Sequence, residues 1–258
     1  MSAIALLSVW TSTLTALDDV NVGSAIITSS KGKPIIKSAS GSSRAGLHST
    51  IGLTQKTITT GAKEHLFLAC SNGLGIGIDS ETEIYFKAYT QSPFSAERAL
   101  LNFEPSTSNL EFELKRGAIS IASEGLSPRS QVWVITANGR IRVHSAKCRI
   151  EQNNTGTTVF IFQGNVTFNY PNKDNREFIS AGDGIRVSSQ SATLNEVAEE
   201  LSVETVDTKT KIFADAAKFA ATRVQFKAPL EGQLAIPILV TPKSYFEQDP
   251  VRPYEFSE

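Results

Sequence analysis

The chain has 258 residues and a formal net charge of −1, from 25 Lys plus Arg against 26 Asp plus Glu. This balance argues against a general nucleic-acid binder and against a dedicated polybasic membrane-surface protein, because both carry a basic excess. Forty per cent of the residues are apolar and two are cysteines. That is enough for a hydrophobic core, but too few thiols for a zinc knuckle or a disulfide scaffold.

The first 16 residues resemble the tail of a signal peptide, since the apolar run Ala3–Trp10 is followed by small and polar residues up to Ala16. No positive segment precedes the run, so a first β-strand is the alternative. No apolar run reaches the ~18 residues that a membrane-spanning helix needs. We therefore expect a periplasmic or otherwise exported protein. Residues 17–49 form a lead-in segment, with weak strands predicted near Val20–Thr28 and Lys33–Ser38.

From about residue 50 the chain alternates apolar and polar residues in short runs. Alternation with a period of two places one set of side chains in a core and the other in solvent. Tight-turn dipeptides such as Asn72-Gly73 and Asn138-Gly139 separate the runs. This pattern predicts a mainly β domain over residues 50–188. Glu111 and Glu113 alternate with core positions, so we expect them on a solvated strand face rather than in a catalytic pair.

The pattern becomes helical over residues 189–224. Thr193 and Glu196 form a capping-box signature, and apolar residues then recur at helical spacing at Leu194, Val197, Ala198 and Leu201. A second helix is predicted from about Asp207 to Thr222, with its apolar stripe at Ile212, Ala216, Phe219 and Ala220. Five prolines in residues 225–258 forbid a regular helix there. We expect an extended tail that pairs or docks through Leu234–Val240.

No catalytic or metal-binding motif is found. The glycines of Gly73–Gly77 have the wrong spacing for a phosphate loop and are followed by a strand pattern. None of the three histidines lies at ligand spacing from another metal-binding residue. We therefore expect no catalytic residue, no metal and no cofactor.

The two cysteines, Cys70 and Cys148, both lie in alternating apolar stretches. In an exported protein they could form a disulfide. Two buried free thiols are an equally good interpretation. The sequence leaves both open.

The one local concentration of basic residues is at Arg140, Arg142 and His144, which share one strand face, with Lys147 and Arg149 just beyond. Such a stripe suits contact with an anionic polysaccharide, a lipid headgroup or an acidic protein patch. An ordinary solvated face paired with acidic neighbours is the alternative. We take the five residues as the candidate partner-contact site.

Several segments of the β region together resemble the FecR domain. They occur in the family's order. The threonine-glycine opening is Thr60-Gly61-Ala62, and the closing turn is Ala181-Gly182-Asp183. Between them lie a strand–glycine–strand unit at Leu110–Ile121 with Gly117, the segment Val134–Val143, and a hairpin at Val159–Val166 with Gly164. The resemblance covers about residues 50–188. The chain departs from the family at His144–Lys147, which replaces a glycine-threonine pair, and at an insertion over residues 91–108.

The resemblance implies a twisted β-solenoid or a sandwich of short strands, with no catalytic residues to transfer. FecR transducers place this domain in the periplasm, where it contacts the signalling domain of an outer-membrane receptor. The resemblance therefore implies a non-enzymatic protein-interaction module at the cell envelope. The alternatives are a structural envelope or surface component, and a carbohydrate-binding module that uses exposed Tyr85, Tyr89 or Trp133.

Overall fold

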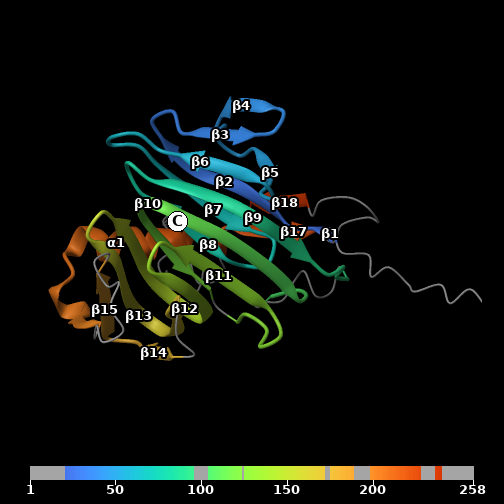
Figure 1. The fold of residues 1–258 in the computed structure, drawn as a ribbon. Coiled ribbons are helices and arrows are strands. Elements are labelled where there is room, and N and C mark those ends of the chain that lie inside the picture. Colours follow the sequence, from blue (N-terminus) through green and yellow to red (C-terminus); the bar gives the residue numbers. More distant parts are fainter. Residues whose placement is uncertain are drawn as a thin grey trace, which may run out of the picture.

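The computed structural model describes residues 21–95, 104–123, 125–171, 175–188, 198–227 and 236–239. Strands make up most of this part of the chain, and one α-helix lies near its C-terminal end (Figure 1). The prediction of a mainly β fold is therefore confirmed. The expected signal-peptide remnant at residues 1–16 lies outside the described residues.

Three long strands organise the sheet: β10 (Ser108–Ala122), β12 (Gly139–Asn153) and β13 (Gly156–Asn169). Each pairs with different neighbours along its two halves. The first half of β10 pairs with β9 (Glu83–Gln91), whereas its second half pairs with β8 (Gly75–Ile78). The long strands therefore belong to two layers at once.

The change of neighbours occurs at glycines and bulges. Gly117 in β10 has a φ of +90° and Gly164 in β13 has a φ of +71°, a region that glycine enters at little cost. A Cβ atom on Gly164 would overlap the backbone carbonyl of Ser145, so a larger residue would shift the strand. The pairing of β12 with β13 changes register between Val143 and Ala146. Such bulges bend a strand, and here they carry it from one layer into the other.

We name each layer after one of its central strands. The β11 layer contains the first halves of β10 and β12, the second half of β13, and β9, with the shorter strands β1 (Asn21–Val22), β3 (Ile35–Ser38), β4 (Gly41–Arg44), β6 (Lys56–Thr59), β11 (Gln131–Thr136) and β14 (Arg176–Ser180). The β8 layer contains the other halves of the long strands and β8, with β2 (Ser24–Lys31), β5 (Thr50–Gly52), β7 (His65–Cys70), β15 (Asp183–Ser188) and β16 (Glu199–Ser202). Only the pairing of β10 with β11 is parallel among the described strands.

The inward side chains of both layers form one buried cluster. Phe112 and Val134 from the β11 layer and Ile76 and Ile150 from the β8 layer are all fully buried in it. Tyr89 of β9 belongs to the same core, and its hydroxyl accepts a hydrogen bond from the backbone N–H of Asn72, just after β7, at 3.0 Å. Burying a large apolar side chain contributes ~1.5–3 kcal/mol, so this shared cluster is the main force that holds the layers together.

Both cysteines are in this core, and both are free and buried. The structure therefore supports the second interpretation of the sequence, in which the two thiols are reduced. Burial raises the pKa of the Cys148 thiol to about 12 and that of Cys70 further still. Neither thiol is a ready nucleophile at neutral pH.

The outer faces of the two layers differ. In the β11 layer, burial alternates along β9 and β11, so every second side chain is at least partly exposed. In the β8 layer, all four residues of β8 and five of the six in β7 are buried. A strand that is buried on both faces must be covered on its outer side.

The cover of the β8 layer is helix α1 (Thr208–Thr222), which contacts β7, β8, β10 and β12 (Figure 1). Asp207 caps it, since its Oδ1 accepts from the backbone N–H of Thr210 at 2.9 Å. The predicted bounds of this helix are confirmed. Within the described ranges, no helix is long and apolar enough to cross a membrane.

The predicted apolar stripe of this helix is wrong in part. Ala220 is buried as expected, but Ile212 and Phe219 are 61% and 48% exposed, and the helix instead buries Ala214 and Ala217. The reason lies in the facing strand. A Cβ atom on Gly75 of β8 would overlap the carbonyl of Ala217, so helix and strand approach too closely for large side chains between them.

The helix predicted from Thr193 is contradicted in the residues that the structure describes, from 198 onward. Residues 189–197 lie outside the described part, and Glu199–Ser202 is strand β16, which pairs with β15. An exposed edge of β15 offers backbone hydrogen bonds to this segment, and these outweigh a short helical periodicity. A 3-10 turn, η2 (Val203–Thr205), then leads to the cap of α1.

A short hairpin follows α1. Strand β17 (Val224–Lys227) pairs with β18 (Ile236–Leu239), so the predicted pairing near Leu234–Val240 is confirmed for the described residues. Phe226 packs against Ile26 and Ala69 of the β8 layer. The hairpin therefore extends the cover that α1 begins.

Candidate partner-contact surface

Strand β12 carries all five residues of the predicted basic stripe on its outward side. Because the strand passes from one layer to the other, the stripe is divided. Arg140, Arg142 and His144 precede the bulge and belong to the β11 layer, whereas Lys147 and Arg149 follow it and belong to the β8 layer. The structure therefore does not bring the five residues together on one surface.

Helix α1 covers the second half of the stripe. Lys147 Nζ pairs with Asp215 Oδ1 of the helix at 2.5 Å. Arg149 is only 6% exposed, and its guanidinium lies 5.9 Å from the ring centroid of Phe213 on the helix. Both side chains bind the chain itself, so the surface open to a partner excludes them.

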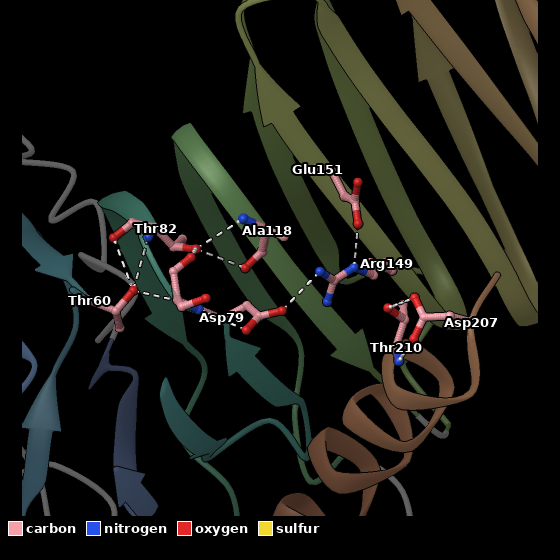
Figure 2. Close-up of polar contacts among 9 residues, drawn as sticks. Thr60, Asp79, Thr82, Ala118, Arg149, Glu151, Asp207 and Thr210 are labelled. Atoms are coloured by element: carbon pink, nitrogen blue, oxygen red, sulfur yellow. Dashed lines mark hydrogen bonds and ion pairs between the residues drawn. The ribbon is translucent and has the colours of Figure 1, made fainter. Parts of the chain in front are cut away.

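Figure 2 shows how carboxylates surround Arg149. Its Nη2 donates to Asp79 Oδ2 at 2.9 Å, and its Nε donates to Glu151 Oε1 at 2.6 Å. Asp207, the cap of α1, lies nearby, and its pKa is lowered mainly by the hydrogen bonds from Thr210 and slightly by Arg149. Arg149 is thus the cation that neutralises the acidic groups where the helix begins.

The position of Asp79 is fixed by a second set of hydrogen bonds in the same view (Figure 2). Its carbonyl oxygen accepts from the Thr60 hydroxyl at 2.5 Å, and its backbone N–H donates to Ala118 at 3.0 Å. The Thr82 hydroxyl also bonds to the backbone of Ala118. This polar corner joins β6, β9 and β10, so the ion pair with Arg149 has a rigid acceptor.

The first half of the stripe is uncovered and lies beside an aromatic ring. The guanidinium groups of Arg140 and Arg142 are 4.7 and 5.8 Å from the ring centroid of Trp133 on β11. Arg140 is also 3.7 Å from Glu111. No carboxylate pairs with Arg142 in the described part of the chain, and its Nε is buried without a hydrogen-bond partner there.

The strand register extends this site across the sheet. Phe178 of β14 is paired with Thr167 of β13, and Thr167 is paired with Arg142. His144 Nε2 is 2.9 Å from the Thr167 hydroxyl, and the His144 ring lies 6.4 Å from Phe178. Burial, and then the charge of Arg142, lower the pKa of His144. Both effects favour the neutral imidazole.

We call this surface the bare face and define it by five residues, Trp133, Arg140, Arg142, His144 and Phe178. Sequence reasoning missed Phe178, which is 62% exposed, and weighed Trp133 only as a sugar platform or core residue. Alternation along the strand was the available signal, because Trp133 stands between inward Val132 and Val134, and Phe178 precedes inward Ile179. This alternation does not tell which strands become neighbours in the sheet.

The three aromatics considered for sugar binding are not free platforms. Tyr89 is fully buried. A cation lies near each of the other two rings: Lys115 is 5.7 Å from the centroid of Tyr85, and two arginines approach Trp133. This arrangement gives a carbohydrate-binding module little support. No cluster of three or more metal-binding side chains occurs within the described ranges.

Residues 56–167 match the family described as FecR protein. The match contains Trp133 and the whole stripe on β12. The resemblance noted in the sequence is thereby confirmed over these residues, while Phe178, α1 and the β17–β18 hairpin lie beyond the matched part.

Other comparisons add two distant structures. Two crystal structures, each described as a candidate anti-sigma factor from Parabacteroides distasonis, share 12% and 10% identity with this chain, with TM-scores of 0.42 and 0.41. The alignments cover 57% and 72% of this chain, and 59% and 99% of the respective structures. No curated protein matches the chain.

Proposed function

We propose that this chain is a non-enzymatic regulatory protein of envelope signalling, in which the FecR domain acts outside the cytoplasm as a protein-interaction module. The FecR match supports the regulatory class, which is not typically enzymatic. The resemblance of residues 1–16 to a signal peptide supports export. The partner we propose is an envelope protein, and the signalling domain of an outer-membrane receptor is the first candidate.

The bare face is the observation that supports binding. Arg142 is partly exposed on this face and pairs with no carboxylate of the described residues. A guanidinium binds a carboxylate well because the two groups match in geometry, so an acidic side chain of a partner would suit this face. Exposed Phe178 and the arginine-flanked Trp133 supply the aromatic anchors that interfaces favour.

The test is capture of partners from envelope extract with the full chain as bait. The double variant Arg140→Glu and Arg142→Glu reverses both charges of the bare face. We expect it to lose at least tenfold in partner recovery, because truncating one partner of an interfacial charge pair costs ~2 kcal/mol or more. The matched control is Lys37→Glu with Arg44→Glu, which makes the same charge change on exposed positions of β3 and β4. The control should capture as much as the wild type.

Equal capture by both double variants would remove the bare face from the proposal. Recovery of only untagged copies of the bait would favour a structural envelope component instead. Both variants change exposed or partly exposed side chains, so their unfolding midpoints should stay near that of the wild type.

A further inference from the structure

The outward side of α1 carries the large apolar side chains that its sequence spacing would place in the core. Ile212 and Phe219 are 61% and 48% exposed. They are seven residues apart, which is two helical turns, so they project on the same side. The opposite side packs on the sheet, where Ala214, Ala217 and Ala220 are buried and Phe213 lies against Phe67 of β7. The helix therefore presents an apolar stripe, defined by Ile212 and Phe219, away from the protein.

Cations flank this stripe on both sides. At 100° per residue, Lys209 and Arg223 lie on one side of it, and Lys211 lies on the other side beyond Asp215. The guanidinium of Arg223 lies 5.3 Å from the ring centroid of Phe219. The segment is thus locally basic, although the whole chain has a net charge of −1.

Residues 207–223 contain two carboxylates, and both already have partners within the protein. Asp215 pairs with Lys147 of β12, and Asp207 accepts the hydrogen bonds of the helix cap. Among the described contacts, neither pairs with Lys209, Lys211 or Arg223. The outward face of α1 therefore combines exposed apolar side chains with an excess of positive charge.

From this combination we propose that α1 lies on an anionic lipid surface, with Ile212 and Phe219 at the boundary of headgroups and acyl chains and the flanking cations among the headgroups. An interfacial helix needs both an apolar stripe and flanking Lys or Arg. The helix contacts four strands of the β8 layer, so it lies on the sheet with Ile212 and Phe219 on its outward side.

Charge favours an anionic lipid surface over a second copy of the chain as the partner of this stripe. Two α1 helices packed stripe to stripe would bring the cations of one copy against those of the other, and like charges repel. An acidic protein partner has complementary charge, but a convex helix gives its side chains no groove to fill. A flat anionic surface satisfies both the charge and the shape.

The experiment measures co-sedimentation of the full chain with vesicles. The wild type should bind vesicles of equal parts phosphatidylglycerol and phosphatidylcholine, and bind pure phosphatidylcholine far less. Replacing both apolar residues, Ile212→Gln with Phe219→Gln, should lower the partition coefficient at least tenfold, since each buried side chain contributes roughly that factor. Replacing Lys209→Gln with Arg223→Gln should lower it about tenfold at low salt.

Leu47→Gln is the matched control, because it removes an apolar side chain that is 58% exposed from the loop between β4 and β5 instead of from α1. It should bind vesicles like the wild type. Far-ultraviolet circular dichroism should show the same helix content in every variant, and Ile212→Gln alone is the fallback if the double variant does not fold.

Two results would overturn the proposal: no binding of the wild type to phosphatidylglycerol vesicles, or equal binding by the variant without apolar residues. Loss of an acidic protein partner in that variant, without any vesicle binding, would assign the stripe to a protein and also overturn it. The test does not depend on the bare face, so its failure would leave the proposed function intact.

Discussion

The two outer faces of this protein are built on the same strands and differ in what covers them. On the β8 layer, the outward positions are glycine, alanine, serine and phenylalanine, and α1 packs directly on them. On the β11 layer, the outward positions of β11 are Gln131, Trp133 and Ile135, those of β9 include Tyr85 and Lys87, and no helix of the described part covers them. Strand β12 runs through both, so its outward cations are structural in one half and accessible in the other. The role of a charged residue on a strand therefore depends on which element packs over its side chain. Its position along the strand does not decide this.

The strongest test of the covered face is its closest contact. Gly75→Ala adds one Cβ atom against the carbonyl of Ala217, and we expect a loss of about 3 kcal/mol in the free energy of unfolding, the upper end for overpacking. Urea denaturation measures it. Gly46→Ala is the control, since the nearest atom to its Cβ would be Ser49 Oγ at 3.7 Å. A loss below ~0.5 kcal/mol for Gly75→Ala would show that the helix is not tightly packed on β8.

The two arginines of β12 provide the next comparison. Arg149→Gln removes the cation between Asp79 and Glu151, and we expect a loss of about 2 kcal/mol because two partly buried carboxylates lose their partner. Arg142→Gln removes a cation that pairs with no described carboxylate, and it should change the stability by less than ~0.5 kcal/mol. Both are measured by urea denaturation. Equal losses would contradict the division of the stripe into a covered and a bare half.

The smallest expected effect is on pH dependence. His65 lies against Phe67 and Phe213 beneath α1, and burial, then Lys31 and Lys209, lower its pKa although Asp79 opposes the shift. A lowered histidine pKa means that its stabilising contribution is complete above the unfolded pKa of ~6.5 and is lost as the pH falls through that value.

His65→Gln should therefore lose less stability than the wild type when the pH falls from about 7.5 to about 5.5. His144, whose pKa is also lowered, should act in the same direction. Thermal unfolding of His65→Gln and of His144→Gln at the two pH values measures both effects. If the wild type and His65→Gln lost the same stability between the two pH values, His65 would not titrate in this way.

Much of the fold follows from local sequence. Leu110, Phe112 and Leu114 alternate with polar residues and are buried as predicted, because the pleat of a strand has a period of two. Asp207 begins α1 and Thr222 ends it, since a capping side chain and helix-forming residues act within one or two turns. The FecR resemblance, too, was readable from the spacing of short strands and glycines.

Other features depended on contacts between distant segments. Glu199–Ser202 became a strand because β15 offered it an edge, which no local pattern reveals. The inward side of α1 was set by Gly75 and Gly77 on β8, because Gly75 lets the backbone of Ala217 approach and Gly77 makes room for the ring of Phe213. The candidate site was divided because a bulge in β12 sends its two halves into different layers.

The sequence by itself determined which residues alternate, where turns fall and where α1 starts and stops. These features depend on backbone preferences over a few neighbouring residues. Only the tertiary structure decided that Lys147 and Arg149 lie beneath α1, that Arg140 and Arg142 stay uncovered beside Trp133, and that Ile212 and Phe219 point outward. Those outcomes depend on which surfaces pack together. Packing is a property of residues far apart in the chain, so periodicity within one segment cannot specify it.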